Sequence, residues 1–376
     1  MKRLSWNDVL DKVKNDGDIN FVSEAITPLH ALGIETFLVH QKKSGVRIKG
    51  FILVVPHPQT GWALTEDMFH VACYDGITVA ELELNTFTDN IDYNYFLRLS
   101  PTRQETSIFY YASPYAPSFS RIPQVMALRP EYRLKVVITE EGTGSYVSNP
   151  YKLEKYKRAK MSTKDCLLFF IQIGLRNRYF EYKLRRTGKF EKFLMYRKEG
   201  KKLQPNPEYV TSVKEIFSGE PVEGDYSLYE DAVVFVPGLL FDAGMIRNRC
   251  DVEIYKKIKE VLGTDTKYIV KPHPREKSLE AYDCLNCEVE KNNQYSCERI
   301  FSHLNHKPRY VIGDCSTTLA NVAALFGIKT IAINKLINRS SLFDKNLFKV
   351  YNRCFDKIVY IPNNWNELGE FFQEFK

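Results

Sequence analysis

The sequence predicts an α/β layered fold of two consecutive domains. Short apolar runs rich in β-branched residues alternate with helical patterns along the chain. The alternation stops at a stretch rich in proline and glycine and then starts again, and 376 residues suffice for two domains of ordinary size.

In the first half we expect six strands and three helical stretches. The strands are predicted at residues 20–23, 36–40, 47–55, 77–82, 107–111 and 134–139, and the helices at 25–32, 121–128 and 162–186. The polar segment that follows, residues 188–225, is interpreted as a connection because proline and glycine are dense in it.

In the second half the alternation restarts near residue 232. Strands are predicted at residues 232–236, 268–271, 310–313, 329–333 and 357–361, and helices at 251–262, 297–304, 317–326 and 365–375. The boundary is expected near residues 205–228. This gives an N-terminal domain of residues 1–215 with a helical, basic insertion and a C-terminal domain of residues 216–376.

The composition, 44% hydrophobic and 26% charged, is that of a globular protein. Much of the net charge of +7 lies between Lys152 and Lys202. Such a segment attracts the phosphates of a nucleotide or of an anionic membrane, or is simply a solvated helix face; the sequence leaves these open. No RNA- or DNA-binding signature accompanies it, so we expect no nucleic-acid partner.

A cytoplasmic location is expected. Residues 1–18 are polar and charged, unlike a secretory signal, and the longest apolar run, residues 166–175, is too short to span a bilayer. Eight scattered cysteines fit reduced thiols. The C-x-x-C pair Cys284 and Cys287 has no second pair, and the D-x-D at residues 16–18 precedes the first predicted strand, so we expect no metal site.

An acidic pair, Glu140 and Glu141, follows the predicted strand 134–139 and precedes a loop with two glycines, Gly142 and Gly144. In α/β folds ligands bind at this end of the strands. A carboxylate whose pKa is raised by its neighbour can take a proton from an attacking hydroxyl. The alternative is an acid pair that caps a turn or a helix.

A histidine, His273, precedes Pro274 and stands two residues after Lys271, at the end of the predicted strand 268–271. Proline stiffens the backbone, and basic neighbours favour an anionic ligand. His273 is therefore a candidate to donate a proton or a hydrogen bond to a departing phosphate, with a buried structural histidine as the alternative. His57 stands in a second His-Pro pair but lacks the basic neighbours.

Three hydroxyl residues, Ser316, Thr317 and Thr318, follow the predicted strand 310–313 and open the predicted helix 317–326. Such residues cap a helix, and the same helix terminus attracts phosphate. The sequence has no Walker loop, no G-x-G-x-x-G after a strand and no nucleophile elbow. Phosphate would then be held by the helix terminus and side chains rather than by a metal ion.

Together, Glu140-Glu141-Gly142, His273-Pro274 and Ser316-Thr317-Thr318 resemble the three short motifs of bacterial sialyltransferases. Residues 140–145 and 271–275 are most similar to the lipooligosaccharide sialyltransferases of glycosyltransferase family 52, and bacterial polysialyltransferases share the motif order. The resemblance implies a GT-B fold of two Rossmann-like domains facing a cleft. It also implies inverting, metal-independent transfer of sialic acid from CMP-sialic acid to a glycan hydroxyl of lipooligosaccharide or capsule.

The same resemblance implies roles for individual residues. His273 would act on the departing phosphate, and Glu140, or else Glu141, would be the base. Relatives in family 52 place a base in the loop after the first strand of the second domain, where Asp242 is the only acid. The implied donor-binding positions are Gly238, Lys271, Pro274, Ser316, Thr317, Thr318 and Ser23. Together with Ser23, Glu24 and Thr27 would line the cleft opposite the donor.

Two other functions stay open on the sequence alone. One is transfer of another CMP-activated acid such as Kdo, or of a different nucleotide sugar. The other is a non-catalytic binding protein of polysaccharide assembly. The expected partners are a nucleotide sugar, a glycan acceptor and, through the basic segment, a peripheral contact with the anionic inner membrane.

Overall fold

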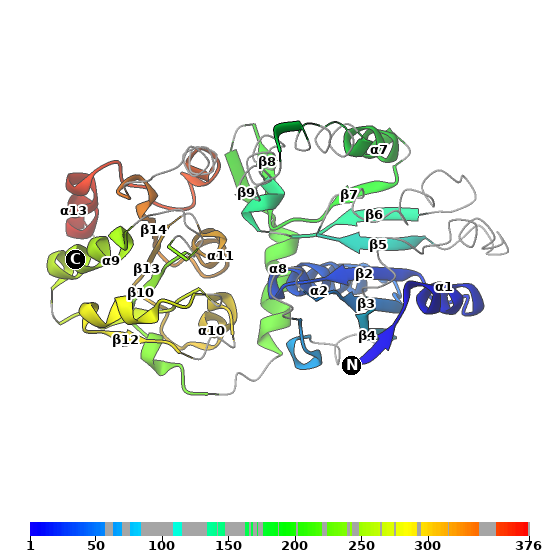
Figure 1. Ribbon diagram of the computed structural model, residues 1–376, viewed down its shortest axis with the longest axis horizontal. Helices are drawn as coiled ribbons and strands as arrows, with labels where there is room; N and C mark the ends of the chain where they lie inside the picture. Colours follow the sequence, from blue (N-terminus) through cyan, green and yellow to red (C-terminus); the bar gives the residue numbers. More distant parts are fainter. Residues whose placement is uncertain are drawn as a thin grey trace. The chain divides into compact units, whose positions relative to one another are not determined.

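A computed structural model describes most of the chain. The described residues are 1–56, 63–69, 76–83, 108–114, 134–140, 142–146, 162–164, 167, 171, 176–186, 188–200, 202–219, 224–238, 241–242, 248–263, 265–273, 276–291, 295–314, 316–337 and 351–374. They form two compact units (Figure 1). The first unit is Met1–Met195 with Pro207–Ile216, and the second is Tyr196–Asn206 with Phe217–Lys376.

The first unit contains a seven-stranded sheet in the order β1-β4-β3-β2-β5-β6-β7, and every neighbouring pair is parallel. The strands are β1 Lys2–Leu4, β2 Phe21–Ala25, β3 Gly50–Val54, β4 Ile77–Leu82, β5 Phe109–Ser113, β6 Leu134–Ile138 and β7 Phe190–Lys192. From β2 the next strands are added on one side, and from β5 on the other. The strand order therefore reverses between β2 and β5, which is where open α/β sheets bind ligands.

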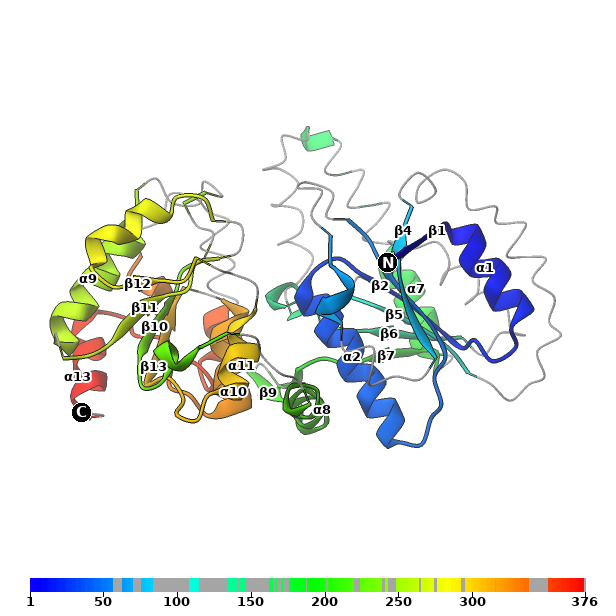
Figure 2. The ribbon, with the colours of Figure 1, turned by 90° about the horizontal axis from the view of Figure 1, so that it is seen from below.

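Helices cover both faces of this sheet (Figure 2). They are α1 Trp6–Asn15, α2 Pro28–Lys43 and α7 Arg176–Arg186, and α8 Pro207–Ser218 follows later in the chain. Trp6 of α1 and Leu184 of α7 are buried with Val22 of β2 in one hydrophobic cluster. On α2, Phe37 lies against the rings of Phe21 and Tyr110, so α2 packs on the opposite face.

The starts of α1 and α2 follow from their capping residues. Ser5 accepts a hydrogen bond from the backbone N–H of Asp8, whose carboxylate accepts one from the N–H of Ser5 in return, forming a capping box. Thr27 caps α2, and Pro28 occupies its first position, where the missing N–H costs nothing.

Several sequence predictions for the first unit were wrong. Residues 36–40 lie inside α2 and are not a strand, because a helix buried on most of its sides shows no amphipathic period. The helix expected at 25–32 begins only at Pro28, after β2. The polar start of the chain contributes the edge strand β1 and helix α1. The helix expected at 121–128 lies outside the described residues.

The segment 188–225 was predicted to be a connection but contains regular structure. Besides β7 and α8 it forms an antiparallel hairpin of β8 Tyr196–Glu199 and β9 Lys202–Pro205. Pro207 and Gly219 stand at the two ends of α8, which are the positions where these residue types delimit a helix. Their density therefore marked a helix boundary rather than a loop.

The second unit contains a five-stranded parallel sheet in the order β12-β11-β10-β13-β14. The strands are β10 Val233–Val236, β11 Tyr268–Val270, β12 Glu288–Val289, β13 Tyr310–Gly313 and β14 Thr330–Ala332. The order reverses between β10 and β13. The strand predicted at 357–361 is reduced to one bridge, between Tyr360 and Ile331.

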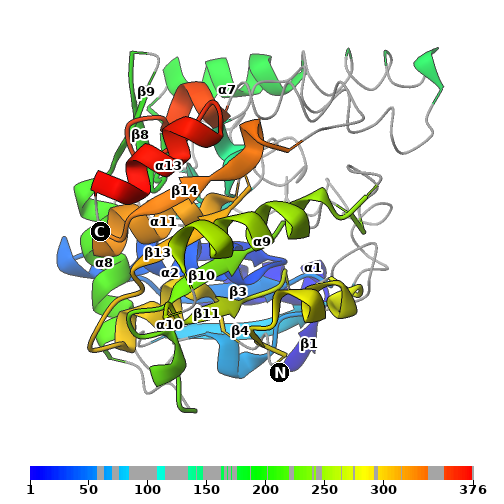
Figure 3. The ribbon, with the colours of Figure 1, turned by 90° about the vertical axis from the view of Figure 1, so that its left-hand side faces the viewer.

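Among the described residues, the helices that cover this second sheet include α9 Cys250–Leu262, α10 Cys297–His303, α11 Thr317–Phe326 and α13 Trp365–Glu374. Figure 3 looks onto the face covered by α9 and α13, whose Tyr255 and Phe372 are buried with Phe235 of β10. Helices α10 and α11 lie on the other face (Figure 2). Each unit is a parallel sheet between helices, which confirms the predicted fold class of two Rossmann-like domains. Among the described residues, no helix is both long and apolar enough to cross a bilayer.

Candidate functional site

In the second unit, the predicted donor-binding residues follow three neighbouring strands. Gly238 comes two residues after β10, Lys271 directly after β11, and Ser316 three residues after β13. Because β11, β10 and β13 are adjacent and parallel, their carboxyl ends lie at one edge of the sheet. The sheet thus brings these residues to the edge where such folds bind nucleotides.

Position 238 favours glycine because another residue of the chain lies very close to it. A Cβ atom at this position would lie 2.2 Å from Oδ2 of Asp314, a residue that is only 4% exposed. Asp314 follows β13 directly, so the loops after the two central strands meet at this point. The sequence interpretation overlooked Asp314, although an acid directly after a buried strand is a visible signal.

The hydroxyl residues open helix α11. Ser316 is its N-cap and accepts a hydrogen bond from the backbone N–H of Thr318 at 3.2 Å. The hydroxyl of Tyr351 donates to the carbonyl oxygen of Ser316 at 2.9 Å, which fixes the cap. Ser316, Thr317 and Thr318 are all half-buried. A partly accessible helix N-terminus with three hydroxyl side chains suits a phosphate group.

Lys271 and His273 follow the end of β11. The backbone N–H of Lys271 donates to the carbonyl of Phe235 at 2.8 Å, and the Lys271 side chain is buried. His273 is half-buried, and its carbonyl accepts from the backbone N–H of Glu276 at 2.8 Å, closing a turn. Pro274 lies outside the described residues.

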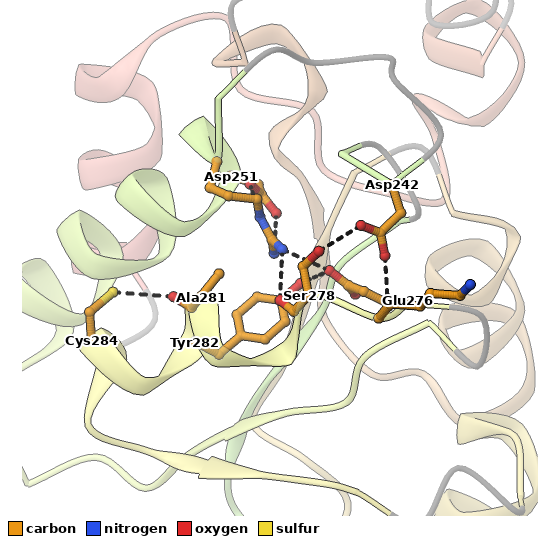
Figure 4. Close-up of polar contacts among 9 residues, drawn as sticks. Asp242, Asp251, Glu276, Ser278, Ala281, Tyr282 and Cys284 are labelled. Carbon is orange, nitrogen blue, oxygen red and sulfur yellow. Dashed lines mark hydrogen bonds and ion pairs between the residues drawn. The ribbon is translucent and has the colours of Figure 1, made fainter.

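Asp242 holds the loop that follows His273 (Figure 4). Its carboxylate accepts a hydrogen bond from the backbone N–H of Lys277 at 2.6 Å and another from the hydroxyl of Ser278 at 2.7 Å. These two bonds, chiefly the first, lower the pKa of Asp242. A carboxylate that is stabilised in its charged form binds a proton weakly, which weakens its case as a general base.

A buried cluster around Arg249 anchors the same loop from the other side (Figure 4). The guanidinium binds both carboxylate oxygens of Asp251, at 3.2 and 3.1 Å, and Oε1 of Glu276 at 3.0 Å. It also donates to the carbonyl of Ser278 at 3.1 Å, and the Tyr282 hydroxyl donates to Glu276 at 2.7 Å. No local pattern in the sequence predicts this cluster, because its members are separated along the chain.

In the first unit, Glu140 lies two residues after β6 and is only 1% exposed. Its carboxylate accepts hydrogen bonds from the backbone N–H groups of Gly142, at 2.7 Å, and Met195, at 3.1 Å, and from the hydroxyl of Tyr146. Burial raises its pKa to about 6, although these bonds act in the opposite direction. The second acid of the pair, Glu141, lies outside the described residues.

A second buried acid, Glu24, stands near the end of β2, where the strand order of the first sheet reverses. The Tyr111 hydroxyl of β5 donates to its Oε2, and burial raises its pKa to about 7. Its neighbour Ser23 is fully buried and donates to the carbonyl of Ala112 at 2.7 Å, within the sheet. The sequence signal for Glu24 was a single acid in an otherwise apolar strand.

The comparisons with known proteins agree with the resemblance in the motifs. The family described as "Alpha-2,8-polysialyltransferase (POLYST)" matches residues 90–335, nearly two-thirds of the chain. This range contains Glu140, His273 and Ser316. No curated protein sequence matches the chain significantly.

Several solved structures resemble the chain at low identity. An alpha/beta-galactoside alpha-2,3-sialyltransferase from Photobacterium phosphoreum has 10% identity and a TM-score of 0.42, with 91% of this chain and 97% of that chain covered. The GT-B domain of a sialyltransferase from Photobacterium damselae has 12% identity and a TM-score of 0.42, with 91% and 99% covered. A UDP-GlcNAc 2-epimerase from Methanocaldococcus jannaschii has 10% identity and a TM-score of 0.45, with 94% and 98% covered.

Two of these proteins are sialyltransferases and the third is an epimerase, so likeness of fold does not identify the activity. The identification depends on the family match, which covers most of the chain and includes its acidic, His-Pro and hydroxyl motifs. The two Rossmann-like units are the pair from which the GT-B fold is built. The chain belongs to the alpha-2,8-polysialyltransferase family and is thus a glycosyltransferase of the bacterial sialyltransferase class.

Proposed function

We propose that this protein transfers sialic acid from CMP-sialic acid to a glycan hydroxyl of a bacterial surface polysaccharide, either lipooligosaccharide or capsule. The reaction inverts the configuration of the anomeric carbon and needs no metal ion. The name of the family, alpha-2,8-polysialyltransferase, favours a sialic acid residue as the acceptor.

The observation that carries the proposal is the shared carboxyl edge of β11, β10 and β13 in the second unit. At that edge the α11 N-terminus, after β13, offers backbone N–H groups and hydroxyls to a phosphate. Lys271 and His273 follow the end of β11, which is separated from β13 by β10. Positive partial charge, hydroxyl donors and an imidazole together suit a nucleoside monophosphate as leaving group.

In the proposed reaction the bond between the sialic acid anomeric carbon and the CMP phosphate oxygen breaks. His273 donates a proton or a hydrogen bond to that oxygen, and Ser316 and Thr317 bind the phosphate. The acceptor oxygen attacks the opposite face of the anomeric carbon and gives its proton to Glu140. The products are CMP and the lengthened glycan.

Glu140 is preferred to Asp242 as the base because of their protonation equilibria. The pKa of Glu140 is raised to about 6 by burial, whereas hydrogen bonds lower the pKa of Asp242. A base works best when its pKa lies close to the working pH. Glu140 must release one of its hydrogen bonds to accept the proton, and the Tyr146 hydroxyl can rotate to do so.

A donor screen tests the proposal. Purified protein is given CMP-, UDP- and GDP-sugars with and without EDTA, and the released nucleotide is measured. We expect CMP release from CMP-sialic acid that EDTA does not reduce and that His273→Ala lowers by about 100-fold or more, the usual contribution of a general acid. The exposed histidine His306 provides a matched control, His306→Ala, which should retain full activity. Turnover of another sugar nucleotide alone would refute the donor assignment.

The basic segment supports a peripheral contact with an anionic membrane. Helix α7 presents two tyrosines and two basic residues on one face. Tyr182 and Lys183 lie three and four residues after Tyr179, and Arg186 lies four and three residues after them. Tyr179 and Tyr182 are 53% and 56% exposed, while Leu184 on the opposite face is buried. Aromatic rings beside basic groups are the combination that interfacial helices present to lipid headgroups.

Vesicle sedimentation tests this contact. We expect binding to vesicles that contain anionic lipid, release at high salt, and loss of binding in Lys183→Glu/Arg186→Glu. Lys256→Glu, on the exposed side of α9, is the control. Equal binding to neutral and anionic vesicles, or none to either, would contradict the proposal.

A further inference from the structure

Two carboxylate oxygens among the described residues are buried without a hydrogen-bond partner: Oε1 of Glu24 and Oε2 of Glu276. Glu276 forms an ion pair with Arg249 through its other oxygen. Among the described residues, the hydrogen-bond partner of the Glu24 carboxyl group is the Tyr111 hydroxyl, which donates to Oε2. No cation of these residues lies within ion-pair distance of Glu24. Glu24 is therefore the less compensated of the two acids.

Such a group is costly for the fold. A buried polar atom without a partner costs about 1–3 kcal/mol, and an apolar residue in the same strand would avoid this cost. The raised pKa of Glu24, about 7, has the same origin, because burial disfavours the charged form. Buried unsatisfied groups of this kind are concentrated at functional sites, where a ligand supplies the missing partner.

The position of Glu24 points to a ligand as well. It is the penultimate residue of β2, and Tyr111 belongs to β5, so the pair stands where the strand order of the first sheet reverses. In the second unit the equivalent reversal, between β10 and β13, is the place where Gly238 meets Asp314, beside the hydroxyl residues of α11. Each unit thus has polar groups at its own reversal point, as the rule for open α/β sheets predicts.

The chemistry of the pair selects the kind of ligand. In its ionised form, above its raised pKa, the Glu24 carboxylate repels phosphates and carboxylates, so the charged groups of a nucleotide sugar do not suit it. Among the described residues no group of three or more His, Cys, Asp or Glu could hold a metal ion. The missing partner of Oε1 is a hydrogen-bond donor, and on a glycan the abundant neutral donor is a hydroxyl.

We propose that Glu24 and Tyr111 form a binding site for the glycan acceptor, in which Oε1 of Glu24 accepts a hydrogen bond from a sugar hydroxyl and Tyr111 holds the other oxygen. This inference rests on the proposed transfer of sialic acid to a glycan. It assigns acceptor recognition to the central strands of the first unit, separately from the donor-binding residues of the second. Glu24 is 6% exposed, so a small displacement of its surroundings uncovers the carboxyl group.

The test separates acceptor binding from donor chemistry. Glu24→Gln, Glu24→Leu and Tyr111→Phe are assayed for the KM of a sialylated oligosaccharide acceptor and for hydrolysis of CMP-sialic acid without acceptor. We expect Glu24→Leu to raise the acceptor KM about tenfold or more, the equivalent of one hydrogen bond to a charged group, and to leave donor hydrolysis unchanged. Thr36→Ala is the control, because Thr36 is buried and its hydroxyl donates to the carbonyl of Leu32 within α2.

Each outcome has a defined meaning. If Glu24→Leu folds and keeps the acceptor KM of the wild type, the inference is overturned. If Glu24→Leu does not fold, Glu24→Gln and Tyr111→Phe decide, because both keep the side-chain volume; an unchanged acceptor KM in both also overturns it. If the wild type neither hydrolyses nor transfers CMP-sialic acid, the proposed function fails instead. In that case binding of the oligosaccharide alone, compared between wild type and variants, still decides the inference.

Discussion

The buried carboxyl of Glu24 makes the stability of the first unit depend on pH. Its pKa is about 7 in the folded protein, compared with an ordinary value of 4.5. The folded state therefore favours the neutral form. Glu24→Gln keeps the size and polarity of the side chain but removes the titration, so the difference between the two proteins isolates this group.

The sign and size of the effect follow from the two pKa values. The contribution of the neutral form to the free energy of unfolding is fully present below pH 4.5. It decreases as the pH rises toward 7 and is lost above pH 7. A difference of one pKa unit corresponds to 1.36 kcal/mol, so the full loss is about 3 kcal/mol. Between pH 5 and pH 8 we expect wild type to lose about 2.5 kcal/mol more than Glu24→Gln.

Hydrogen exchange in increasing urea measures this difference for each unit. Peptides that contain β2 and β5 report on the first unit, and those that contain β10 and β13 provide an internal control in the second. The free energy of opening should depend on the Glu24 substitution in the first set only. A difference between the two proteins that stays constant from pH 5 to pH 8 would refute the conclusion that burial raises the pKa of Glu24.

Three further predictions concern the second unit. Gly238→Ala should abolish donor turnover, because the new Cβ atom would lie 2.2 Å from Oδ2 of Asp314. Gly369→Ala in α13 is the control and should leave turnover unchanged, because a Cβ atom there would have nothing within 4 Å. Equal activity of the two variants would contradict this steric argument. Asp242→Asn should lower kcat yet keep the acidic limb of the pH–rate profile, and loss of that limb would instead identify Asp242 as the base. Arg249→Met should lower the free energy of unfolding in urea by about 3–5 kcal/mol, because it leaves buried carboxylates unpaired; a loss below about 1 kcal/mol would show that solvent compensates them.

The sequence predicted the second unit more accurately than the first for a physical reason. Its strands are short, continuous apolar runs that end at a distinctive residue, such as Lys271 after β11 or Gly313 at the end of β13. Helix α11 carries its own signals, a serine cap at its start and Gly327 in a left-handed conformation after its end. Local patterns of this kind do not depend on tertiary contacts.

In the first unit, tertiary burial overrode the local pattern. Residues 36–40 contain the β-branched and aromatic types of a strand but lie in α2, where the Thr36 hydroxyl donates to the carbonyl of Leu32. The motif residues Glu140 and Ser316 could be found because each lies within three residues of the end of a strand. Arg249 could not, because its importance depends on carboxylates that only the folded chain brings to it.

The hairpin of β8 and β9 limits how this protein can be divided. Tyr196 and Lys202 of the hairpin bind Asn321 and Asp356 of the second unit, and the chain then returns to the first unit at Pro207. The backbone thus passes between the units three times within about twenty residues. Any single cleavage point in this stretch leaves one half incomplete. Chimeras that exchange halves between relatives must therefore carry the whole stretch, with its three crossings, from a single parent.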